Sequence, residues 1–153
     1  WGRIKLNSSK ADEIITKKQY VFKSFERGIK NKRKSLRSEL LFYLFSGRRW
    51  FKKLDMIQTC NMAFFKSDCV NVNGFNEDFF GWGREDSEFA ARLLNFGIKR
   101  RDIRYKALAY HIHHIGNSRN MLETNHQIYL NTINNALIWS DNGIDKYLNK
   151  IKK

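Results

Sequence analysis

The stretch Asn73–Leu94, with the sequence NGFNEDFFGWGREDSEFAARLL, decides how this chain is interpreted. Its second half has the pattern of an amphipathic helix, because one helical face carries Phe89, Ala90, Leu93 and Leu94. Polar residues fall elsewhere around the same helix, at Glu85, Glu88, Arg92 and Asn95. We expect the helix to end at Gly97, with Ile98 packing back on Leu93 as in a Schellman motif.

The acidic pair Glu85-Asp86 falls in or just before the first turn of this helix. Unpaired backbone N–H groups and the helix dipole favour negative charge there by about 0.3–1 kcal/mol. Gly81 and Gly83 flank Trp82, and glycine lets the backbone adopt unusual conformations and lets a ligand approach closely. A carboxylate beside an aromatic wall is suited to activating a sugar hydroxyl. The simpler alternative is a pair of ordinary capping acids and a core tryptophan.

Several motifs occur in order along the chain: Cys60-Asn61-Met62-Ala63-Phe64, Val72-Asn73-Gly74-Phe75, Gly81-Trp82-Gly83-Arg84-Glu85-Asp86 and Arg92-Leu93-Leu94, followed by a histidine-rich segment. As an ordered set they resemble the C-terminal half of family 2 glycosyltransferases. The likeness is closest to bacterial enzymes whose C-terminal region is similar to animal galactosyltransferases. It extends from about Gln58 to Arg119, with a weaker echo at Gly2-Arg3.

The resemblance implies an α/β chain that forms the C-terminal part of a GT-A (nucleotide-diphospho-sugar transferase) fold. Such a fold holds a nucleotide-sugar donor, a divalent metal (Mn²⁺ or Mg²⁺) and a glycan acceptor. Asp86 would be the general base of an inverting transfer, and Glu85 would orient the acceptor or the base. The other implied substrate-binding residues are Trp82, which would stack on the sugar, together with Asn61, Gly81, Gly83 and Arg84. Arg84 stands where the family often has glycine.

Three histidines come close together near the end of a predicted strand, Arg104–His113. The segment Tyr110-His111-Ile112-His113-His114 matches the Tyr-His-x-x-His pattern of the same family. The resemblance therefore implies His111 as a metal ligand, with His114 second. A strictly extended strand would point these two side chains to opposite faces, so both can bind one ion only if the strand bends after His111. The alternative is that the histidines lie on the surface or contact the acceptor.

The chain has no Asp-x-Asp motif, the element with which enzymes of this type bind the metal and the diphosphate, and it has no glycine-rich phosphate loop. It also begins at Trp1 rather than at methionine. We therefore expect a C-terminal fragment that lacks roughly the first hundred residues of a GT-A domain. Such a fragment would carry the acceptor side of the site. It would be inactive when isolated, and metal binding would require the missing N-terminal half.

Positive charge is concentrated at the N-terminal end. Residues 1–53 hold 16 Lys and Arg against 4 Asp and Glu, whereas residues 54–153 hold 13 against 11. We therefore predict three parts: a basic, mainly helical arm (1–53), the acceptor-side half of the transferase domain (54–140) and a polar tail (141–153). The arm suits an anionic membrane surface, a nucleic acid, or a plain helical hairpin packed on the domain. Nucleic acid is the weakest of these readings, because it gives Trp82 and the acidic pair no role.

The sequence has two cysteines, which make no disulfide framework and favour a reducing cytoplasm. No apolar run approaches the ~20 residues that span a bilayer. We expect a cytoplasmic glycosyltransferase, attached peripherally to the inner face of the membrane if the arm binds lipid, that acts on a surface polysaccharide or lipid-linked glycan. The alternative is a non-catalytic carbohydrate- or membrane-binding module on the same scaffold.

The remaining pattern predicts the other elements of the chain. We expect one or two helices over residues 9–29, with Ser9 as the cap, and another helix with an apolar stripe over residues 36–45. A strand is predicted over Ile57–Phe65, a short helix after Ser67-Asp68 and a loop over Asn76–Phe80. A long helix is predicted over Thr124–Ser140.

Overall fold

The computed structural model describes residues 2–18, 27–31, 36–47, 50–51, 54, 57–58, 61–112 and 114–148. The chain has mixed α/β structure and divides into two compact units, of which the first contains a sheet and the second is mainly helical in the part that the structure describes. The first contains Trp1–Trp50 and Arg101–Ile115, and the second contains Phe51–Arg100 and Gly116–Lys153. Two short strands, β3 (Trp50–Phe51) and β4 (Arg100–Arg101), pair with each other.

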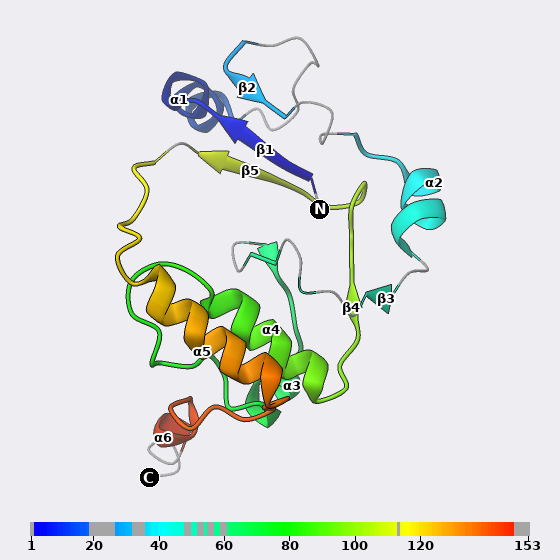
Figure 1. The fold of residues 1–153 in the computed structure, drawn as a ribbon. Helices are drawn as coiled ribbons and strands as arrows, with labels where there is room; N and C mark the ends of the chain where they lie inside the picture. The colour runs from blue at the N-terminus through cyan, green and yellow to red at the C-terminus, as the bar shows by residue number, and fades with distance from the viewer. Residues whose placement is uncertain are drawn as a thin grey trace. The chain divides into compact units, whose positions relative to one another are not determined.

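A three-stranded sheet forms the centre of the first unit, with the strand order β2-β1-β5. Strand β1 (Gly2–Leu6) pairs in parallel with β5 (Leu108–Ile112), so that Ile4 lies opposite Tyr110. On its other edge β1 pairs antiparallel with β2 (Ile29–Lys30). The parallel pair β1 and β5 and the helix α1 beside them can be followed in Figure 1.

The core of the first unit lies between this sheet and helix α1 (Ser8–Lys17). Four apolar side chains are buried there, from Ile4, Leu6, Ile14 and Ile29. The helix begins at Asn7, whose side chain accepts a hydrogen bond from the Lys10 N–H, and it ends at Lys18 in the left-handed conformation. The predicted cap at Ser9 is therefore wrong by two residues, and Ile29 belongs to a strand rather than to a helix.

The predicted helix over residues 36–45 is present as α2 (Glu39–Phe42), which continues into the π-helical turn η2 (Tyr43–Gly47). Ser38 caps α2 by accepting a hydrogen bond from the Leu41 N–H. The Ser38 N–H donates to the carbonyl of Tyr105, and Phe42 lies beneath two cations, Arg101 and Lys106. This side of the helix therefore packs on residues 101–106. Large apolar side chains remain exposed on the same segment, namely Leu36, Leu40, Tyr43, Leu44 and Phe45.

Helices α4 (Glu85–Asn95) and α5 (Leu122–Asn134) pack side by side and form the frame of the second unit (Figure 1). The short helix α3 (Lys66–Asn71) precedes them, and α6 (Asp145–Leu148) follows them. Buried Phe89 on α4 stacks on Phe75 with the ring centroids 4.2 Å apart, and it meets Phe64 edge-on at 4.9 Å. Val72 and Leu93 complete this core.

The sequence predicted α4 closely. Its C-terminal end is the expected Schellman motif, because the Gly97 N–H donates to the Leu94 carbonyl and the Ile98 N–H donates to the Leu93 carbonyl. Ile98 also packs against the buried cluster that contains Leu93. The predicted short helix is present, but it begins at Lys66, so that Ser67 and Asp68 lie inside it rather than before it. The loop at 76–80 is confirmed.

Three predicted elements have other bounds or are absent. A strand was predicted over Ile57–Phe65. Asn61 instead lies in a turn, where its N–H donates to the Gln58 carbonyl, and residues 62–65 form no strand. The predicted strand from Arg104 begins only at Leu108, since Tyr105 has a φ of 68° within a turn. The helix predicted to reach Ser140 ends at Asn134, just before Ala136 at a φ of 49°.

The predicted polar tail contains the short helix α6. None of the helices in the described part of the chain is both long and apolar enough to cross a bilayer.

Candidate functional site

The Gly-Trp-Gly-Arg segment forms a tight turn that leads directly into α4. Gly81 and Gly83 have φ values of 71° and 115°, a region that glycine adopts at little cost. Gly83 is also held by packing, because a Cβ atom on it would lie 2.7 Å from the Leu122 Cδ1. The backbone conformation therefore favours glycine at this position, and a side chain there would also displace the end of Leu122 on α5.

Arg84 continues the turn with a φ of 74°, which makes it a non-glycine residue in the left-handed region. This conformation costs an L-residue about 1–2 kcal/mol. The Arg84 guanidinium lies over the Tyr129 ring, 5.1 Å from its centroid. Such a cation–π contact recovers about 0.5–1 kcal/mol at an exposed site. The position at which the resembling family often has glycine is thus one where the backbone itself favours glycine.

The two acids of the candidate site differ in their local roles. The Gly83 N–H donates to the Glu85 Oε2 at 3.0 Å, so Glu85 closes the turn at the start of α4. Asp86 is half-buried in the first turn of the helix and accepts a hydrogen bond from the Ser87 Oγ at 3.3 Å. Both carboxylates lie where the helix dipole favours negative charge. Glu85 is therefore engaged in shaping the turn, in addition to any contact with a substrate.

Trp82 does not belong to the core, because its side chain is 41% exposed. The Arg119 guanidinium lies over the indole, 4.8 Å from the ring centroid. This placement argues against the alternative of a core tryptophan. Asn61 is half-buried, and its Nδ2 has no hydrogen-bond partner in the part of the chain that the structure describes.

The two histidines that match the family pattern come together in the first unit. The rings of His111 and His114 have centroids 5.0 Å apart, and His114 Nδ1 lies 3.0 Å from the Ile115 carbonyl oxygen. The chain thus brings together two side chains that a strictly extended strand would separate. His113 lies outside the described residues.

A divalent metal is only partly accommodated by these side chains. Two imidazoles are suitable ligands for Mn²⁺ or Zn²⁺. However, within the described ranges no group of three or more His, Cys, Asp or Glu side chains is arranged to hold a metal ion. On these residues the histidine pair supplies part of a coordination shell, and the remaining ligands would have to come from elsewhere.

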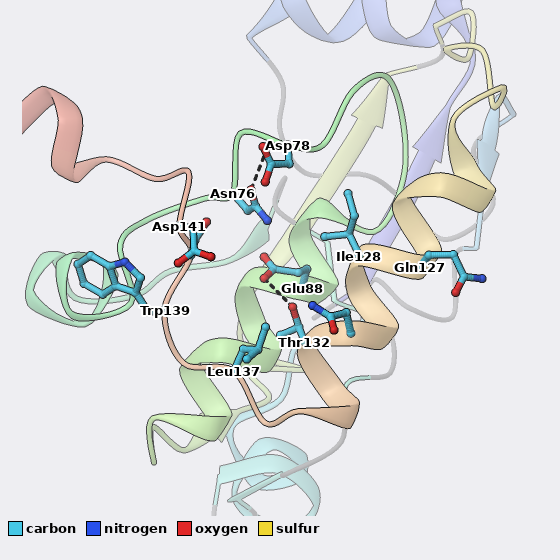
Figure 2. A pocket seen from close by; sticks show the side chains of 11 residues that line it. Asn76, Asp78, Glu88, Gln127, Ile128, Thr132, Leu137, Trp139 and Asp141 are labelled. Atoms are coloured by element: carbon cyan, nitrogen blue, oxygen red, sulfur yellow. Dashed lines mark hydrogen bonds between the residues drawn. The ribbon is translucent and has the colours of Figure 1, made fainter.

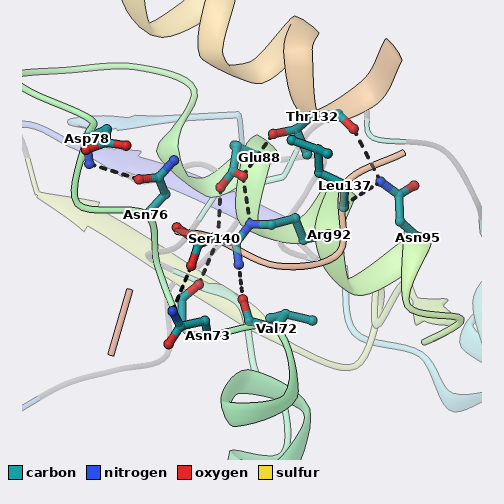
Figure 3. A network of polar contacts seen from close by, with 11 residues as sticks. Val72, Asn73, Asn76, Asp78, Glu88, Arg92, Asn95, Thr132, Leu137 and Ser140 are labelled. Carbon is teal, nitrogen blue, oxygen red and sulfur yellow. Dashed lines mark hydrogen bonds and ion pairs between the residues drawn. The ribbon is translucent and has the colours of Figure 1, made fainter. Parts of the chain in front are cut away.

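Sequence reasoning missed a buried polar network beneath the candidate site, drawn in Figure 3. Glu88 and Arg92 on α4 are 1% and 0% exposed, and they form a two-bonded ion pair with N···O distances of 2.7 and 2.9 Å. Arg92 also donates to the carbonyls of Val72 and Gly74, and the Thr132 hydroxyl donates to Glu88 at 3.0 Å. The ion pair therefore ties α4 to the 72–74 turn and to α5.

Asn73 holds the C-terminal part of the second unit to the same turn. This buried residue donates from Nδ2 to the Ser140 carbonyl and to the Asp145 carboxylate, and its Oδ1 accepts from the Asp145 N–H. Gly143 approaches so closely that a Cβ atom on it would lie 1.9 Å from the Asn73 carbonyl oxygen. The spacing of Glu88 and Arg92, four residues apart on a helix, was the one signal in the sequence for this network.

Comparison with known proteins supplies independent evidence. Residues 45–115 match a family model described as the N-terminal domain of galactosyltransferase. The match supports a galactosyltransferase-like glycosyltransferase domain. It includes the segment from Gly81 to Asp86 and both His111 and His114, and it draws residues from each of the two units. No significant match was found among curated proteins or among solved structures.

Proposed function

We propose that this chain carries the acceptor side of an inverting glycosyltransferase of GT-A type. The donor would be a nucleotide sugar, and the acceptor a hydroxyl of a surface polysaccharide or lipid-linked glycan. The observation that carries the proposal is the turn Gly81–Arg84, which lies within the galactosyltransferase-like match and places an exposed indole just ahead of two helix-terminal carboxylates.

The proposed reaction assigns one role to each part of this turn. Asp86 accepts the proton of the acceptor hydroxyl, and the resulting oxygen nucleophile bonds to the anomeric carbon of the donor. The bond from that carbon to the nucleoside diphosphate breaks, and the diphosphate leaves with the electron pair. A positioned general base contributes about 10²–10⁴-fold to such a step. Trp82 would stack on the apolar face of the acceptor sugar, which its exposure permits.

The histidine pair would act on the nucleotide-sugar donor, and it would not take part in removing the proton from the acceptor hydroxyl. We propose that His111 and His114 contribute ligands to a divalent cation, Mn²⁺ or Mg²⁺, whose chemistry is to neutralise the charge of the departing diphosphate. Their ring separation of 5.0 Å supports a shared ion. Isothermal titration calorimetry of MnCl₂ into the protein as its gene encodes it, which would include the remaining ligands, tests this role without an activity assay. We expect the heat of binding to disappear in His111→Ala, and unchanged binding in that variant would refute it.

The two acids can be separated by kinetics in the protein as its gene encodes it. We expect Asp86→Asn to lower kcat, because an amide cannot accept the acceptor proton. We expect Glu85→Gln to act mainly on the acceptor KM, because Glu85 shapes the turn by accepting the Gly83 N–H. If Glu85→Gln lowers kcat as strongly as Asp86→Asn does, the assignment of the base to Asp86 alone is wrong.

We also propose that the segment Leu36–Leu44 contacts an anionic membrane surface. Leu36, Leu40 and Leu44 recur every four residues, and Leu40 and Leu44 are 66% and 56% exposed. Cations accompany them on the same unit, among them exposed Arg37 and Lys106. Apolar side chains flanked by cations are the pattern of interfacial helices, where each Lys or Arg near an anionic surface contributes about 1 kcal/mol.

A further inference from the structure

The second unit contains a pocket whose lining does not include the segment from Gly81 to Asp86. It lies between the loop at Asn76 and Asp78, helices α4 and α5, and the segment from Leu137 to Asp141 (Figure 2), and its volume is about 370 Å³. None of Trp82, Glu85 and Asp86 lines it. Much of its wall, including all of α5 and the 137–141 segment, also falls outside the range of the galactosyltransferase-like match.

The charge of the pocket disfavours anionic ligands. Two exposed carboxylates, Asp78 and Asp141, line it, and no Lys, Arg or His is among its lining residues. The third acid, Glu88, is neutralised by Arg92 behind it. Lys146 is linked to Asp78 through Asn142, but its ammonium is paired with Glu77. In a chain of net charge +14, this is a locally acidic recess that would repel a phosphate or a nucleotide.

The remaining lining groups suit a polyhydroxylated ligand. Amide side chains of Asn76, Gln127 and Asn131 both donate and accept hydrogen bonds, and carboxylates accept them from hydroxyls. Trp139, which is 46% exposed, lies at one end of the pocket and offers an apolar ring together with Leu137 (Figure 2). This mixture of an aromatic wall and a few polar groups is typical of small-molecule sites.

We propose that this pocket binds one neutral glycosyl unit, at a site distinct from the sugar-transfer site at Asp86. The volume lies near the lower end of the range for small-molecule pockets, about 300–1,000 Å³, which suits a monosaccharide unit better than a nucleotide. Such a site would hold one sugar unit of a glycan while another sugar unit of the same glycan lies at the transfer site. The proposal stands on the pocket alone and does not require Asp86 to be a base.

Saturation-transfer-difference NMR on the whole chain tests whether the pocket binds a neutral sugar. The neutral probes are galactose, glucose and N-acetylglucosamine, and the anionic probe is glucose 6-phosphate. We expect at least one neutral sugar to bind, and glucose 6-phosphate to bind about tenfold more weakly, equivalent to about 1.4 kcal/mol. In a Trp82→Ala background, which removes the sugar contact proposed at the transfer site, Trp139→Ala and Asp141→Asn should each abolish the signal. Both residues are exposed enough for the variants to fold.

Trp82→Ala is the matched control, because it removes an equally exposed tryptophan from the other site. We expect it to leave sugar binding at the pocket intact. Absence of binding by all three neutral sugars would overturn the proposal. So would a signal that survives Trp139→Ala but is lost in Trp82→Ala, since it would place the sugar at the transfer site instead.

Discussion

Replacing Arg92 with methionine should destabilise the second unit severely. The substitution keeps the apolar stem but leaves the Glu88 carboxylate, 1% exposed, as an uncompensated buried charge. It also removes the donors to the Val72 and Gly74 carbonyls. Removing one partner of a buried ion pair costs about 3–5 kcal/mol, a large share of the roughly 5–15 kcal/mol that stabilises a typical domain.

Urea denaturation, followed by tryptophan fluorescence and circular dichroism, measures this loss. With a slope of about 2 kcal/mol per molar urea, we expect the midpoint to fall by about 1.5–2.5 M. Hydrogen exchange over residues 85–95 restricts the readout to α4 and should show lost protection there. The double variant Glu88→Leu/Arg92→Met should recover part of the loss, because no unpaired charge then remains.

Glu77→Gln is the control, since it breaks the exposed ion pair between Glu77 and Lys146 in the same unit. Exposed pairs add little to stability, so we expect almost no change in the midpoint. If Arg92→Met behaves like Glu77→Gln, then the buried pair does not hold α4 to the 72–74 turn, and the reasoning fails.

Three further predictions concern single sites. Arg84 has a φ of 74°, which glycine adopts more readily than alanine, so Arg84→Gly should be more stable than Arg84→Ala by about 1 kcal/mol in the same urea assay. Equal stability of the two variants would show that the turn is not strained. The double variant Leu40→Ser/Leu44→Ser should weaken binding to anionic vesicles in a sedimentation assay by about 30-fold, because about 2 kcal/mol of apolar burial is lost. The equally exposed control Ile15→Ser should not weaken it, and a matching loss in this control would reject the Leu36–Leu44 surface. Burial raises the pKa of the Cys69 thiol, so peptide mapping should show slower alkylation at pH 8 than for a free cysteine, and equal rates would contradict it.

The sequence was informative where structure is determined locally. Helix α4 and its Schellman ending follow from the spacing of Phe89 and Leu93 and from Gly97, all within one short segment. The unusual backbone conformation of the glycines that flank Trp82 was likewise expected from neighbouring residues, whereas the exposure of the tryptophan was left open. These features depend on contacts between residues a few positions apart, and periodicity reports such contacts directly.

Features that depend on distant parts of the chain were missed. Strand β1 exists because it pairs with β5, about a hundred residues later, and its five residues carry too little pattern to be identified alone. The sequence pattern placed Glu88 and Arg92 away from the apolar face of the helix. In the structure both are buried, because the 72–74 turn and Thr132 supply their hydrogen-bond partners. Asn73 took its role from Ser140 and Asp145 in the same way.

The turnover of the Asp86→Asn variant is the most direct test of the central claim, that the turn before α4 is the acceptor side of a glycosyltransferase. The protein as its gene encodes it would be assayed for sugar transfer at saturating donor and acceptor. Asp68→Asn is the matched control, because Asp68 is another half-buried aspartate in the first turn of a helix in the same unit. We predict that Asp86→Asn lowers kcat by about 10²-fold or more while Asp68→Asn leaves it near that of the parent. Near-normal turnover in Asp86→Asn would contradict the claim.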